Sequence, residues 1–114
     1  MSWQDCQPVE ANVGFDYEIA HGGAEMPTIS LFYGVAIMMY FFDEERHRVP
    51  HIHARYQNHR AAFSILDGSL LAGEFPVNKL RLVQAWIEIH REELQADWKL
   101  AINGQPLFVI EPLR

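Results

Sequence analysis

The chain has 114 residues, of which 49% are hydrophobic and 12% aromatic, and these values suit a single globular domain with one core. Its lone cysteine, Cys6, excludes an internal disulfide, and residues 1–20 lack the basic and apolar regions of a signal peptide, so we expect a cytoplasmic protein. The longest apolar run, residues 31–42, is too short to cross a bilayer, so we expect no membrane contact.

The net charge of -6 is unevenly distributed, because residues 1–25 contain five acids and no lysine or arginine. The same segment has no sustained hydrophobic periodicity. It therefore predicts a flexible acidic N-terminal arm over residues 1–25, with a short edge strand over residues 15–19 as the alternative. Residues 26–114 form the predicted single domain.

Two stretches predict the first strands. Residues 29–42 are almost wholly apolar and rich in β-branched and aromatic side chains, which predicts one central strand with a bend or bulge at Gly34. A charged turn over residues 43–46 follows, and Pro50 then opens a second strand over residues 51–56. Alternation along this second strand separates a core face (Ile52, Ala54, Tyr56) from a polar, cationic face (His51, His53, Arg55).

The remaining residues predict two more strands, a helix and a final strand. The third strand, residues 60–66, follows a turn at residues 57–58, and the fourth, residues 70–74, follows a turn at residues 67–68. From Pro76 to about Asn103, apolar residues recur at helical spacing, and this helix can break within residues 90–93. Residues 107–110 form a last short strand. The predicted class is α+β, a small antiparallel sheet of three to five strands with one long or broken helix packed on one face.

Arginine and histidine gather on both sides of Pro50. Residues 46–60 contain four arginines and four histidines and no acid, whereas the rest of the chain is acidic or apolar. Imidazole titrates near neutrality, and the arginine guanidinium binds carboxylates and phosphates, so this segment is the candidate site. The candidate catalytic residues are His47, His51, His53 and Arg55, and the candidate binding residues are Arg46, Arg48 and Arg60.

Metal binding is one hypothesis for this segment. His51 and His53 alternate on a strand and point the same way, as zinc and iron sites require. His47 can return across the turn as a third ligand, and Glu88 or His90 can approach from the helix. A divalent ion such as zinc, iron or nickel is the corresponding cofactor, although the spacing supplies only two of the three or four ligands needed. The alternative is a pair of histidines bonded to the backbone or to carboxylates, with no cofactor.

Acid–base catalysis is a second hypothesis. Cleavage of RNA without a metal needs a base, an acid and a cation, and paired histidines with an arginine can fill these roles. His51, His53 and Arg55 share one predicted face. Because that face is expected to be exposed, replacing either histidine by alanine is expected to leave the fold intact. The alternative is a solvated basic face without chemistry.

A binding module is the third hypothesis. The basic segment can hold an acidic protein partner, or RNA or another phosphate ligand. Tyr56 is expected to face the core, which gives base stacking little support. Trp86 and Trp98 are expected in the core, and residues 90–93 are expected on a solvated helix face with local ion pairs.

Residues 26–114 resemble an uncharacterised bacterial family of small proteins, domain of unknown function four-one-six-zero. The resemblance rests on residues 26–30 and 32–34, on the Pro-His-Ile-His run at residues 50–53, on the turn at residues 67–68, and on residues 80–94. The chain departs from the family pattern in its arm, in its longer acidic turn before His47, and at Val49, where a second proline is common. The family name implies no activity, but its members often lie beside another small domain, in pairs resembling toxin–antitoxin modules. The resemblance therefore implies a protein partner.

Overall fold

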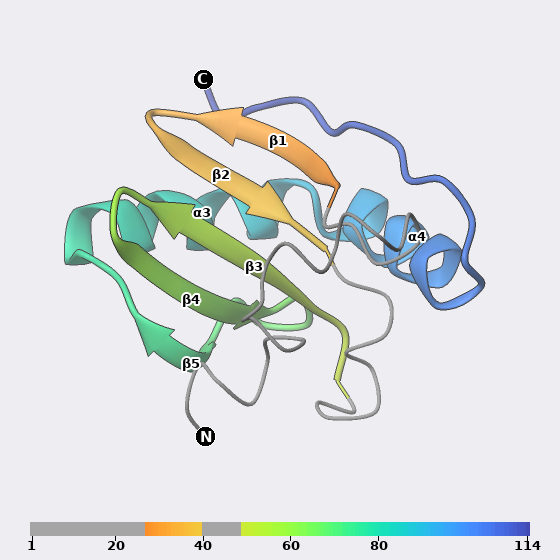
Figure 1. The fold of residues 1–114 in the computed structure, drawn as a ribbon, viewed down its shortest axis with the longest axis horizontal. Coiled ribbons are helices and arrows are strands. Elements are labelled where there is room, and N and C mark those ends of the chain that lie inside the picture. The colour runs from red at the N-terminus through yellow and green to blue at the C-terminus, as the bar shows by residue number, and fades with distance from the viewer. Residues whose placement is uncertain (1–26, 40–48) are drawn as a thin grey trace.

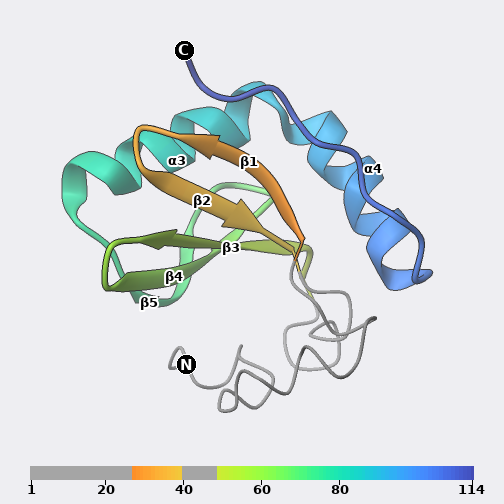
Figure 2. The same cartoon turned by 45° about the horizontal axis from the view of Figure 1, so that its top comes forward.

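The computed structural model describes residues 27–39 and 49–114, which form a five-stranded sheet and two helices. The strands are β1 (Thr28–Phe32), β2 (Val35–Met38), β3 (His51–Tyr56), β4 (His59–Ser64) and β5 (Leu70–Glu74). They lie in sequence order, each antiparallel to the next. The helices α3 (Val77–Ile89) and α4 (Arg91–Ile102) lie on the same side of the sheet (Figures 1 and 2). The predicted α+β class is confirmed.

The apolar run that follows residue 28 is a hairpin, so the prediction of one central strand is wrong. Tyr33 and Gly34 both adopt positive φ, 48° and 81°, as a tight two-residue hairpin turn requires. A Cβ added at Gly34 would lie 3.2 Å from the ring of Tyr56, a close contact that the ring would have to relieve by a small shift. The turn makes β1 an edge strand and places β2 second in the sheet.

The hydrophobic core lies between the sheet and both helices. Ile37, Ile52 and Phe63 from the sheet are fully buried and belong to one cluster with Trp86 of α3 and Leu94 of α4. This confirms the helical repeat and the core positions of the tryptophans, since Trp98 is buried in the same cluster. Among the described residues, no helix is long and apolar enough to cross a membrane.

The predicted break in the helix is confirmed at His90. This residue ends α3 and precedes α4, with φ −109° and ψ 25°, outside the helical range. Its backbone N–H still donates to the Trp86 carbonyl, and its own carbonyl accepts from the N–H of Leu94. The start of α3 after Pro76 has no side-chain cap.

The C-terminal segment, residues 105–114, is extended without forming a strand, so the prediction of a strand at residues 107–110 is wrong. It runs along the outer side of β1 and joins it through one backbone bond, from the Ile110 N–H to the Ile29 carbonyl at 2.8 Å (Figure 1). The Phe108 N–H instead donates to Asp97 on α4, at 2.9 Å. A segment that divides its backbone bonds between a strand and a helix cannot form a continuous ladder.

Candidate functional site

Of the predicted site residues, Arg46, His47 and Arg48 lie outside the described residues, as does the predicted arm. His51 and His53 lie on β3, and both are fully buried. The prediction that they stand on an exposed polar face is therefore wrong. Arg55, two residues further along the same strand, is exposed.

The described neighbours of the two histidines come from the sheet and from α4. β3 is the middle strand of the sheet, and His53 lies between Met38 of β2 and Ala62 of β4. The His51 ring lies 5.2 Å from the His53 ring and 5.1 Å from the Trp98 ring. Its Nδ1 is 2.9 Å from the Val49 carbonyl oxygen. A buried polar ring needs such contacts, because burial without them costs free energy.

The exposed end of β3 brings two arginines together. Arg55 is directly opposite Arg60 on β4, and both side chains are exposed. Residues opposite each other in antiparallel strands project to the same face. The partners of Arg55 and Arg60 on the other strands therefore form one line of side chains across the sheet. We call this line the cross-strand row; in order from β1 to β5 it contains Leu31, Ala36, Arg55, Arg60 and Glu74.

A lysine and two aromatic rings lie together at the β3–β4 turn, towards the helices. The Tyr56 ring stacks on the His59 ring at 6.5 Å, and the Lys79 ammonium lies 5.0 Å from the centre of the Tyr56 ring. Tyr56 also contacts Phe75 of the core, so its predicted orientation towards the core is confirmed. The hairpin end therefore carries positive charge on both sides of the sheet.

Within residues 27–39 and 49–114, no group of three or more histidine, cysteine, aspartate or glutamate side chains could hold a metal ion. Glu88 and His90, the additional ligands considered from sequence, have other partners. Arg91 donates a hydrogen bond to Glu88 at 2.9 Å, and this bond and the arginine charge lower the pKa of Glu88. His90 pairs with Glu93. These pairs confirm the local ion pairs predicted for residues 90–93.

Asp97 is a buried acid that the sequence reasoning missed. It lies on the apolar side of α4, three residues after Leu94 and one before Trp98. This helical spacing from two buried apolar residues could have predicted that Asp97 is buried. Its Oδ1 accepts the Phe108 N–H bond, and its Oδ2 has no hydrogen-bond partner among the described residues. Burial raises the pKa of Asp97, the Phe108 bond lowers it, and the charge of Glu93 raises it further, for a net increase.

We expect Asp97→Asn to stabilise the protein at pH 7. The pKa of Asp97 is higher in the folded protein than in the unfolded chain. The protonated acid therefore favours folding below its ordinary pKa, and this contribution is lost as pH rises through the raised pKa. Asparagine keeps an oxygen for the Phe108 N–H and carries no charge. Urea unfolding should show a gain at pH 7 that shrinks towards pH 3. The control, Asp97→Ala, loses the hydrogen bond, worth about 1 kcal/mol. An asparagine variant less stable at pH 7 would show that the carboxylate is charged and well paired.

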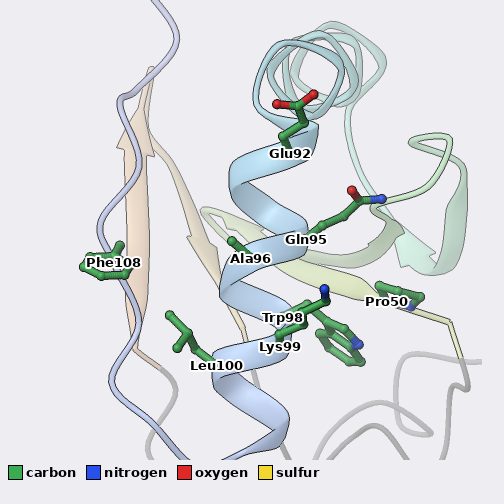
Figure 3. A pocket seen from close by; sticks show the side chains of 8 residues that line it. All are labelled: Pro50, Glu92, Gln95, Ala96, Trp98, Lys99, Leu100 and Phe108. Carbon is green, nitrogen blue, oxygen red and sulfur yellow. The ribbon is translucent and has the colours of Figure 1, made fainter.

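Two hollows lie beside α4. The larger, about 690 Å³, borders both flanks of the helix, and Figure 3 shows its lining side chains around α4. They are Pro50, Glu92, Gln95, Ala96, Trp98, Lys99, Leu100 and Phe108. The smaller, about 620 Å³, lies at the α3–α4 junction and is lined by Glu88, Glu92 and Glu93 among others. Neither hollow is lined by His51, His53 or Arg55.

The family comparison covers the part of the chain that holds these features. The family model described as Domain of unknown function (DUF4160) matches residues 34–99, more than half of the chain. The match includes β2 to β5, α3 and most of α4, and with them Arg55, Arg60 and Asp97. No curated protein and no solved structure matches the chain. The matched range and the motifs within it agree, and the chain belongs to the family described as Domain of unknown function (DUF4160).

Proposed function

We propose that this protein acts by binding an acidic partner protein at the exposed Arg55–Arg60 pair. The observation that carries the proposal is the register of β3 and β4, which sets the two arginines directly opposite each other on the surface. Two cations directly opposite each other on neighbouring strands form a local concentration of positive charge. Guanidinium groups bind carboxylates through paired hydrogen bonds, so two neighbouring arginines on the surface suit an anionic partner.

The charge around Arg55 favours an anionic partner. Arg55 forms no ion pair with another residue of the described ranges. Lys79 lies near the same end of the sheet, on the side of the helices. Glu74 is the one acid in the cross-strand row, and it lies next to Arg60 at the far end from Leu31. A ligand that engages Arg55 therefore meets the two arginines of the row before it reaches Glu74.

The position of the histidines favours binding over catalysis. A general acid or base must come within hydrogen-bond reach of the substrate atom it serves. His51 and His53 are fully buried, and their rings contact each other and Trp98. Hydrolysis by these two histidines, with or without zinc, iron or nickel, would need a substrate to enter the sheet. The arginines need no such opening, because both are at the surface.

The identity of the partner is part of the same proposal. The family resemblance favours a second small protein, encoded beside this one, as in a toxin–antitoxin-like pair. Its binding surface should then be acidic. Co-expression with the neighbouring small protein should give a complex that is weakened by Arg55→Ala and by raised salt. RNA or another phosphate ligand is the competing occupant of the same arginines.

We expect Arg55→Ala to weaken binding of a labelled oligoglutamate peptide by roughly three- to tenfold at low salt, because exposed charged contacts contribute about 0.5–1.5 kcal/mol. Fluorescence anisotropy at several salt concentrations measures this loss, which should shrink as salt rises. The control is Lys99→Ala, which removes an exposed cation on α4.

Equal losses in both variants would show that net charge, and not the arginine pair, holds the peptide. Tighter binding of oligouridine than of oligoglutamate at equal charge would assign the surface to nucleic acid.

A further inference from the structure

We infer that the partner segment carries an apolar side chain beside its carboxylates, and that Leu31 receives it. The inference rests on the proposed function, because it assigns a second contact to the ligand of Arg55. It identifies the partner segment by its chemistry, as an extended acidic peptide with one apolar anchor.

The cross-strand row places the two contacts in one line. Leu31 on β1 is opposite Ala36 on β2, and Ala36 is opposite Arg55 on β3. Neighbouring strands lie about 4.8 Å apart, so Leu31 and Arg55 are separated by roughly 10 Å, and Leu31 and Arg60 by roughly 14 Å. Ala36 between them has only a methyl group. The row therefore presents the apolar side chain of Leu31, then the short side chain of Ala36, and then two arginines.

The exposure of Leu31 is what makes it available. Its side chain is 64% exposed on the sheet face that points away from the helices, and Tyr33 in the adjoining turn is 56% exposed. A single exposed leucine is ordinary on a protein surface. Leu31 differs because it is in register with the arginine pair on a hydrogen-bonded sheet. An apolar anchor flanked by charged contacts is the usual arrangement at a protein–peptide interface.

The spacing also limits the conformation of the partner. In an extended peptide, side chains two and four residues apart project to the same side, about 7 and 13 Å apart. An apolar residue seated on Leu31 thus places carboxylates at positions two and four within reach of Arg55 and Arg60, whose side chains are long and flexible. The matching segment has the form Leu-x-Glu-x-Glu, lying across the strands.

Two labelled peptides and the full-length protein test the inference. One peptide is Ser-Leu-Ser-Glu-Ser-Glu-Ser, and its twin has serine in place of leucine. The leucine peptide should bind at least roughly fivefold more tightly, because covering a leucine side chain contributes about 1–2 kcal/mol when burial is partial. Leu31→Ser should remove this advantage and leave the affinity for the twin unchanged.

The matched control is Val77→Ser on α3, because Val77 is 63% exposed and has no place in the cross-strand row. It should leave both affinities unchanged, and both variants should melt at the temperature of the natural protein. Leu31→Met, which keeps an apolar side chain, should retain the preference.

The outcomes separate this inference from the proposed function. If both peptides bind equally well and Arg55→Ala weakens both, the arginine proposal stands and the Leu31 inference is wrong. If neither peptide binds at low salt, both are wrong. If Val77→Ser removes the preference as Leu31→Ser does, the anchor lies elsewhere and the inference is also wrong.

Discussion

Replacing Trp86 by alanine is expected to lower the free energy of unfolding by about 3–5 kcal/mol, the range for removal of a buried aromatic side chain. Trp86 is fully buried, and its ring lies 5.4 Å from that of Phe32 on β1. Its Nε1–H donates to the Glu111 carbonyl at 2.8 Å, so it also connects α3 to the C-terminal segment. Alanine leaves a cavity in the centre of the core and removes this bond.

Urea unfolding at pH 7 measures the change, and Trp86→Phe separates its two causes. Phenylalanine keeps most of the apolar volume and loses the bond to Glu111. It should cost less than half as much as alanine, since the hydrogen bond is worth about 1 kcal/mol and the remaining loss is one of volume. If Trp86→Ala costs less than about 1.5 kcal/mol, the ring is not the centre of the core.

Replacing His53 by alanine is expected to lower the free energy of unfolding by roughly 2–4 kcal/mol, as for other fully buried side chains of similar size. This reverses the expectation drawn from alternation, which placed His53 on an exposed face. The ring lies beside the His51 ring and between Met38 and Ala62, so its removal leaves a cavity within the sheet. The control is His59→Ala at the exposed turn, which should change stability by less than about 0.5 kcal/mol.

This prediction affects how activity assays are interpreted. Loss of an RNA-cleaving activity in a destabilised His53→Ala variant would reflect unfolding as readily as chemistry, so stability must be measured in parallel. A variant that melts like the natural protein but has lost a cleavage activity would contradict the binding proposal. It would restore the histidine-dependent ribonuclease as the function.

Most of the secondary structure follows from local sequence. The turn at residues 67–68, the glycine and proline near residues 104–106, and the helical repeat of apolar side chains depend on backbone preference and period, which neighbouring residues determine. The break at His90 also fell within the predicted range. The hairpin at Tyr33 and Gly34 did not follow in this way. β2 is buried on both faces, so the apolar run continues through the turn without a polar break, and a tyrosine with positive φ gives no turn signal.

The candidate site depended on tertiary structure. His51, His53 and Arg55 alternate along one strand, so sequence places them on one face and determines that relation correctly. Alternation does not determine their exposure, since the two histidines are buried and the arginine is exposed. Alternation specifies the direction of a side chain relative to its own strand. What surrounds that side chain depends on residues distant in the chain, such as Trp98 beside His51. The strand register, which brings Arg60 opposite Arg55, is likewise decided between distant segments.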